Sequence, residues 1–183
     1  MSQHLEDKEL LLQFKDPLTK EKGYTGIIKK YQERLYWHIR RMVVQHEDAN
    51  DVLQNMFIKV WNGLGNFRED SQLYTWMYRI ATNESLTFLE QQKKRSSVSL
   101  SNEENGLSNQ LRADKNFDSN KIEWKLQLAM QRLPEKQRAV FNLRYYDEMP
   151  YEEMSRVLET SEGALKASYH HAVKKIEDYI LNH

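Results

Sequence analysis

Two adjacent histidines near the C-terminus, with lysines on either side, are side chains that could read nucleic acid. His170 and His171 lie between Lys166 and Lys174. At helical spacing all four face away from an apolar set that comprises Leu165, Tyr169, Ala172, Val173, Ile176 and Ile180. Histidine can donate to or accept from a base edge, and lysine can donate to guanine or to a phosphate. The segment is typical of a DNA recognition helix.

A metal site is the competing interpretation of the two histidines. Adjacent helical residues point about a quarter-turn apart, no third ligand lies nearby, and the sequence has 0 cysteines. The absence of cysteine also excludes disulfides, thiolate zinc sites and a thiol nucleophile. We therefore predict no metal and no cofactor.

Enzymatic motifs are missing from the sequence. It contains no Gly-rich phosphate loop, no serine elbow and no His-Glu-x-x-His motif. The acidic pairs Asp48 with Asp51 and Glu152 with Glu153 are expected on exposed helix faces, where we expect no perturbed carboxylate. The chain is predicted not to be an enzyme, with no catalytic residues.

A second group of polar residues lies on a helix that begins near Glu47. Its apolar stripe is expected to be buried, which leaves Asp48, Asp51, Gln54 and Asn55 on the other face. A polar loop that follows leads into an aromatic segment with Tyr74, Trp76 and Tyr78. The apolar stripe is ordinary core, whereas the polar face and the aromatic segment are available for partners.

These side chains must be positioned by helices. The sequence is 39% hydrophobic and 30% charged, with only 6 Gly and 3 Pro, which favours an all-α protein over a sandwich or barrel. The expected helices cover 5–14, 24–43 with a basic outer face, 47–64, a segment after Ser71 that ends in Lys93-Lys94-Arg95, one that starts at Pro134, 151–158 and 162–181.

A polar segment divides these helices into two groups. Residues 96–120 are poor in large apolar side chains and rich in Ser, Asn and acids, which is typical of a flexible linker. We therefore predict two small helical domains, 1–95 and 121–183. In the second, the helices 151–158 and 162–181 around a short turn form a helix-turn-helix pattern, which also occurs in proteins that bind no DNA.

Charge and hydropathy give weaker indications. Lys plus Arg and Asp plus Glu both total 27, so any nucleic-acid surface has to be local. The N-terminus carries acids where a signal peptide is basic, and no apolar run reaches the length of a membrane span. We predict a cytoplasmic protein without membrane insertion.

The two halves together resemble a bacterial RNA polymerase sigma factor of the extracytoplasmic-function group in the sigma-70 family. The sequence is most similar to members from Bacteroidetes-type bacteria. The motifs that carry the resemblance are YQERLYWHIRRMV, DANDVLQNMFIKVW, FREDSQLYTWMYRIATNESL, LPEKQRAVFNLRYYDEMPYEEMSRVL and TSEGALKASYHHAVKKIEDYI. The first three belong to sigma region 2 and the last two to sigma region 4.

The resemblance implies a promoter-specificity factor that binds core RNA polymerase and recognises the −35 and −10 promoter elements. Its implied partners are the clamp helices and flap of the polymerase, promoter DNA and an anti-sigma factor. Three residue sets carry over: Asp48, Asp51, Gln54 and Asn55 for polymerase; Phe67, Ser71, Tyr74, Trp76, Arg79 and Asn83 for the −10 element, where a base flips into a loop pocket; Lys166, Ser168, His170, His171 and Lys174 for the −35 element.

The sequence departs from the family pattern in three places. The recognition helix has lysine and histidine where members often have arginine, Pro150 replaces a capping serine, and Glu84 follows Asn83 where a neutral or basic residue is usual. Two other function classes stay open: a stand-alone helix-turn-helix regulator that acts without polymerase, and a helical adaptor that binds only proteins.

Overall fold

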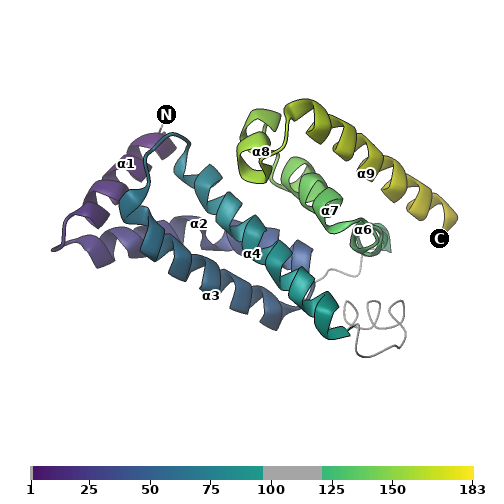
Figure 1. The fold of residues 1–183 in the computed structure, drawn as a ribbon, viewed down its shortest axis with the longest axis horizontal. Helices are drawn as coiled ribbons and strands as arrows, with labels where there is room; N and C mark the ends of the chain where they lie inside the picture. Colours follow the sequence, from purple (N-terminus) through teal and green to yellow (C-terminus); the bar gives the residue numbers. More distant parts are fainter. Residues whose placement is uncertain (1, 97–120) are drawn as a thin grey trace.

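The fold is a set of packed helices, seen here in a computed structural model that describes residues 2–96 and 121–183 (Figure 1). The predicted linker therefore lies outside the described residues except for Ser96. The elements are α1 (Ser2–Lys15), α2 (Lys20–Val43), α3 (His46–Gly63), η1 (Leu64–Asn66), α4 (Leu73–Ser96), α6 (Lys121–Gln131), α7 (Glu135–Phe141), the π-turn η2 (Asn142–Tyr146), α8 (Tyr151–Leu158) and α9 (Glu162–Asn182). No strand occurs in the described ranges, so the all-α prediction is confirmed.

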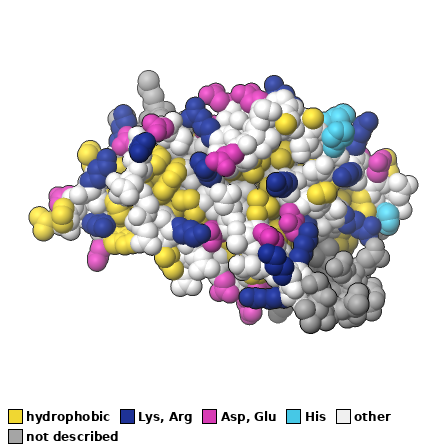
Figure 2. All heavy atoms as spheres, in the orientation of Figure 1, with side chains coloured by type: hydrophobic (Ala, Val, Ile, Leu, Met, Phe, Trp, Pro, Cys, Tyr) yellow, Lys and Arg dark blue, Asp and Glu magenta, His cyan; other side chains and the backbone are white. Residues whose placement is uncertain are grey.

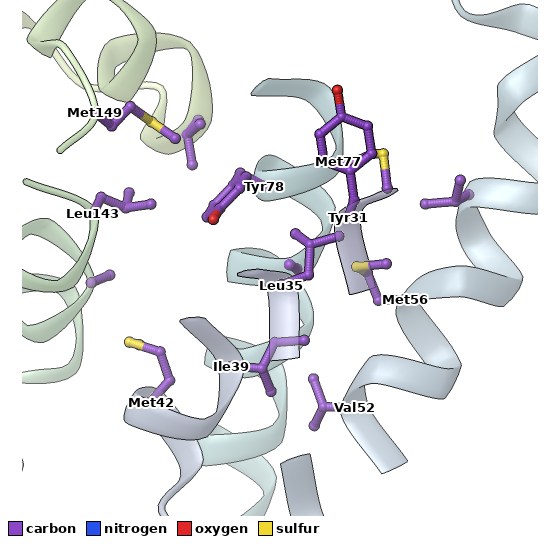
Figure 3. Close-up of a cluster of buried hydrophobic side chains, with 14 of the residues drawn as sticks. Tyr31, Leu35, Ile39, Met42, Val52, Met56, Met77, Tyr78, Leu143 and Met149 are labelled. Carbon is purple, nitrogen blue, oxygen red and sulfur yellow. The ribbon is translucent and has the colours of Figure 1, made fainter. Parts of the chain in front are cut away.

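Helices α1 to α4 form the N-terminal unit, in which α2 packs against each of the other three helices. Leu35 and Ile39 of α2 are completely buried and lie between α3 and α4, as Figure 3 shows. The stripe on α3 that was predicted to be buried supplies Val52 and Met56 to the same core. Burial of this apolar surface is the main force that holds the unit together.

The junction between α1 and α2 follows from local sequence. Helix α1 ends before Asp16-Pro17, as predicted, and the Asp16 carboxylate accepts a hydrogen bond from the Leu18 amide at 3.0 Å. The chain then turns back at once, because α2 begins at Lys20, four residues before the predicted start at Tyr24. The buried Tyr31 hydroxyl donates to Asp7 at 2.7 Å and fixes α1 across α2.

One prediction for α2 was wrong at a single residue. Arg40 was expected on a basic outer face with Lys29 and Arg34, but its side chain is only 1% exposed. Burial lowers the pKa of its guanidinium. The helix is therefore covered at its C-terminal end by elements that the periodicity of α2 did not reveal.

Helices α6 to α9 form the C-terminal unit. Its own small core comprises Ala129, Met130, Leu133, Phe141, Ala172 and Ile176. Pro134 is the N-cap of α7, which begins at Glu135, one residue later than predicted. Pro150 likewise is the N-cap of α8, without a side-chain hydrogen bond. Ser161 caps α9, where its hydroxyl accepts from the Ala164 amide at 3.3 Å.

The two units share a continuous apolar core. Leu143 and Met149 of the C-terminal unit project toward Tyr78 of α4, and Met42 of α2 lies beside them (Figure 3). Helix α8 runs against α4, and η2 reaches α2. The C-terminal unit is thus packed directly on the N-terminal unit.

The fold makes a specific prediction at Gly23, where α2 approaches α1. An added Cβ would lie 2.7 Å from both the Leu10 oxygen and the Phe14 nitrogen, which are backbone atoms that cannot move alone. We expect Gly23→Ala to destabilise the chain by about 1 to 3 kcal/mol in urea denaturation. The control is Gly163→Ala, which meets nothing within 4 Å and should be neutral or stabilising. Equal stability of the two variants would contradict the close approach.

Candidate protein and nucleic-acid interfaces

The polar face of α3 is accessible in this structure. Asp51, Gln54 and Asn55 are exposed, and Asp48 is half-buried one turn before them. Their spacing of three, four and seven residues puts them on one face of the helix. The structure thus brings all four residues of the first predicted set together.

Asp48 differs from what the sequence led us to expect. Burial raises the pKa of its carboxyl, and the neighbouring negative charges of Asp51 and Glu47 raise it further. The expectation of unperturbed acids on this face was therefore wrong for Asp48. An acidic cluster of this kind would gain from a basic partner.

The loop between α3 and α4 is organised by two aromatic rings that contact each other at an interplanar angle of 40°. The ring of Phe67 lies 5.1 Å from that of Trp76, and the indole of Trp76 covers Gly63, where an added Cβ would meet it at 3.1 Å. A larger side chain at Gly63 would push this indole away. A cavity of about 250 Å³ opens beside the loop, lined by Asp7, Lys8, Leu11, Phe67, Glu69, Ser71 and Leu73. Part of this wall, namely Asp7, Lys8 and Leu11, belongs to α1. The sequence did not predict this, because no motif marks these three residues.

The second predicted set is divided by helical geometry. Trp76, Arg79 and Asn83 lie on one side of α4, whereas Tyr74 points about half a turn away. The Tyr74 ring lies 6.2 Å from that of Tyr78, and burial raises the pKa of its phenol. Tyr74 is therefore not brought together with the other predicted −10 residues.

A second cavity separates α4 from α8. It measures about 350 Å³ and is lined by Asp70, Ser71, Thr75, Trp76, Arg79, Ser155, Arg156 and Glu159. Arg79 forms an ion pair with Glu159 of the C-terminal unit. Three of the predicted −10 residues thus border a space whose opposite wall belongs to the other half of the chain.

The predicted recognition helix is accessible along most of its face. Lys166, His170 and Lys174 form one exposed stripe on α9, and His171 is exposed beside it. Ser168 is half-buried and points about half a turn away from this stripe, so the structure does not bring it together with Lys166 and His170. Figure 2 shows histidine next to basic side chains on the outer surface at α9.

Several polar side chains meet between the units, and the sequence predicted none of these pairings. Thr75 donates to Glu153 at 2.6 Å, and Tyr78 donates to Asp147 at 2.9 Å. His38 is completely buried and shares a hydrogen bond with Thr82 at 2.8 Å. A buried polar residue in an otherwise apolar helical stripe is the one signal that could have identified His38.

Neither a membrane span nor a metal site was found within 2–96 and 121–183. No helix there is long and apolar enough to cross a membrane. The described side chains include no group of three or more His, Cys, Asp or Glu residues that could hold a metal ion.

Comparison with protein families finds two matches in the chain. Residues 27–95 match the model described as Sigma-70 region 2, and residues 123–176 match the model described as Sigma-70, region 4. The RNA polymerase sigma-H factor of Pseudomonas aeruginosa is 30% identical over 165 residues, covering 86% of each chain. The ECF RNA polymerase sigma-E factor of Escherichia coli is 29% identical over 168 residues, covering 87% of each.

Two solved structures share the fold. CnrH, in complex with the cytosolic domain of CnrY, superposes with a TM-score of 0.68 over 96% of this chain and 97% of that one, at 18% identity. RpoE from Bartonella quintana, in complex with the anti-sigma factor NepR, gives 0.66 over 87% of this chain and 97% of that one, at 18% identity. The likeness to Bacteroidetes-type members stays a prediction, because none of these comparisons tests it.

The raised pKa of Asp48 predicts how stability changes with pH. A carboxyl whose pKa is raised in the folded state destabilises the fold when it is ionised. This cost vanishes when the pH falls below the ordinary pKa of the carboxyl, 3.8. We expect Asp48→Asn to stabilise the chain at pH 7 by up to about 0.5 kcal/mol, a small gain because solvent screens the site. The gain should disappear near pH 3.5 in urea denaturation. Glu33→Gln, an exposed control on α2, should show no such pH dependence; an identical profile for both would exclude the effect.

Proposed function

The chain belongs to the RNA polymerase sigma factors of the sigma-70 family, in the extracytoplasmic-function group, and we propose a division of the promoter-specificity work among its residues. As a sigma factor it binds core RNA polymerase and directs it to promoters. The observation that carries this function is the succession of the two region matches, 27–95 and 123–176, on the two helical units. We propose that residues 1–95 form the polymerase- and −10-binding domain, 96–120 the linker, and 121–183 the −35-binding domain.

We place polymerase binding on the exposed face of α3. Asp51, Gln54 and Asn55 on this face are exposed, and Asp48 is half-buried. The carboxylate of Asp51 can accept hydrogen bonds, and the amides of Gln54 and Asn55 can both accept and donate them. A basic partner would favour the ionised form of the Asp48 carboxyl, whose pKa is raised. The clamp helices of the largest polymerase subunit are the proposed partner.

We place the −10 element along the loop and the outer side of α4. The 250 Å³ cavity beside Phe67 and Ser71 is the proposed pocket for a flipped base. The neighbouring Trp76 offers a ring for stacking, and the exposed amide of Asn83 can bond to a base edge. Arg79 would bind backbone phosphate once its pairing with Glu159 is released. Tyr74, which points away, is the weakest member of the set.

We place the −35 element on the stripe of α9. Lys166 and Lys174 would bind phosphate or guanine, while His170 and His171 would read base edges. Ser168, about half a turn away from this stripe, is the weakest member of the set. Because the stripe carries two lysines and no arginine, its phosphate attraction is weaker than that of an arginine-rich helix, which favours a less stringent −35 preference.

We propose an anti-sigma partner for this chain. The two solved structures with the same fold each contain a second protein, namely the cytosolic domain of CnrY and the anti-sigma factor NepR. A cytoplasmic location, no catalytic activity and no cofactor complete the proposal.

Transcription in vitro tests the function directly. Core polymerase with this chain should initiate from a subset of genomic fragments, and core polymerase alone should not. Asn83→Ala should reduce promoter opening by roughly tenfold, the loss of one or two hydrogen bonds to a base, and leave duplex binding unchanged. The control is Thr87→Ala, one turn further along α4 and also exposed. Permanganate footprints of the Asn83 variant that equal those of wild type would contradict the −10 assignment.

The polymerase assignment predicts a separate loss. Asp51→Ala combined with Gln54→Ala should weaken binding to core polymerase at least about tenfold in a pull-down titration, since both lose hydrogen bonds at a desolvated contact. Because both residues are exposed, the fold should stay intact. The matched control replaces an acid and an amide elsewhere, Glu90→Ala with Gln91→Ala at the exposed end of α4. Unchanged affinity of the first variant would refute the docking assignment.

A further inference from the structure

One exposed lysine of α1 lies in the wall of the cavity that is the proposed base pocket. We propose that this residue, Lys8, binds a backbone phosphate of the nucleotide that is flipped into the cavity. The inference rests on the proposed function, because it takes the 250 Å³ cavity beside Phe67 and Ser71 as the site of the flipped base. It adds to that site a residue of α1, whereas the other proposed −10 residues belong to the loop and to α4.

Helix α1 forms one wall of this cavity, and the loop that leads into α4 forms the other. Figure 1 shows α1 and the beginning of α4 at the same end of the molecule. Asp7 and Leu11 lie one turn apart on the same face of α1, and Lys8 lies at the edge of that face. Asp7 and Leu11 are buried, whereas Lys8 is exposed. The side chain of Lys8 is therefore at the mouth of the cavity.

Hydrogen bonds to α2 fix the position of this wall. The Asp7 carboxylate accepts from the Tyr31 hydroxyl at 2.7 Å and from the Lys30 ammonium at 2.7 Å. Lys30 also lies 3.3 Å from Glu6, whose side chain is exposed and does not line the cavity. Because the backbone next to Lys8 is held in this way, only the lysine side chain has to become ordered when it binds a ligand.

The charged residues of the cavity wall differ in whether they have partners. Asp7 is paired with Lys30, and the carboxylate of Glu69 lies 3.5 Å from the Lys15 ammonium. Lys8 is the third charged residue of the wall. Its ammonium has no hydrogen bond or ion pair to any of the residues that the structure describes. It is thus available to an anion, while the two acids of the wall are already compensated.

A nucleotide matches both parts of this cavity. Leu11, Phe67 and Leu73 offer apolar and aromatic surface to a planar ring, and the Ser71 hydroxyl can bond to a base edge. The phosphates of a flipped nucleotide stay with the strand, outside the pocket, where the Lys8 ammonium lies. Lysine binds phosphate as a point charge on a flexible stem, so it needs no bidentate geometry.

The salt dependence of DNA binding tests this role. The probe is a fork-junction DNA with a single-stranded −10 segment, taken from a promoter that the transcription assay identifies and bound by core polymerase with each chain. Lys8→Gln should weaken binding about fivefold at low salt and lower the slope of log affinity against log salt by about 0.7, the value for one single-strand phosphate. Lys8→Arg, which keeps the charge, should match wild type.

The matched control removes a different exposed lysine. Lys22→Gln on α2 lies outside the cavity and should keep the wild-type affinity and slope. Since Lys8 and Lys22 are both exposed, neither change should alter the fold, which urea denaturation can verify. An unchanged slope for Lys8→Gln, or an equal loss in both variants, would overturn the proposal.

Neutral methylphosphonates, placed at one linkage of the single strand at a time, locate the phosphate. At one position the substitution should lower the slope of the wild-type chain by the same amount and cause no further loss with Lys8→Gln, because both changes remove one contact. Losses that add at every position would contradict a direct contact. A Lys8→Gln loss that varies with the base at the flipped position would indicate base reading and overturn the phosphate role.

The same probe separates failure of this inference from failure of the proposed function. If polymerase with the wild-type chain does not prefer the promoter fork to a scrambled fork, the −10 assignment is overturned, and the role of Lys8 with it. If Asn83→Ala weakens binding to the fork and Lys8→Gln does not, only the role of Lys8 is overturned.

Discussion

The end of α2 is the point on which the arrangement of the molecule depends. Its last carbonyls lie inside the protein, where each missing hydrogen bond costs about 1 to 3 kcal/mol. The side chains of Gln131 and Arg138 meet two of them, and burial lowers the pKa of the Arg138 guanidinium to about 10. The guanidinium also holds the carbonyls of Met130, Gln131 and Leu133 in its own unit. One side chain thus organises the C-terminal unit and anchors it.

This anchoring gives α4 two neighbours with different chemistry. One side packs on the N-terminal core, and the flank with Thr75 and Tyr78 meets the acids of α8 and the segment before it. The outer side, with Trp76 and Asn83, faces α3 and solvent. On α3, Asp51, Gln54 and Asn55 stay exposed while the units are docked, and Asp48 is half-buried.

Much of the fold could be predicted from sequence because its cause is local. The spacing of the apolar residues predicted the positions of α3, α8 and α9, and the Asp16-Pro17 pair predicted where α1 ends. The interface between the units could not be predicted, because its hydrogen bonds join residues that are far apart in sequence: Tyr78 and Asp147 are 69 positions apart, and His38 and Asn142 are 104 apart. Its members look like ordinary helix-surface residues in sequence. For this reason Arg40 was placed on a basic outer face, and Glu153 was expected on an exposed helix face.

The same distinction applies to the candidate sites. The residues of α3 and of the α9 stripe were found together because each set lies on one helix face, where spacing alone decides proximity. Tyr74 was grouped with Trp76 from family likeness, although helical geometry separates them. The cavity beside Phe67 could not be predicted, because part of its wall comes from α1, which is distant in sequence and carries no recognisable motif.

The pairing of Arg79 with Glu159 and of Thr75 with Glu153 has a consequence for how such a factor can evolve. A substitution on this flank of α4 therefore changes how firmly one half of the chain holds the other. Glu153 on α8 and Glu159 just after it are the positions where a second substitution can restore the balance.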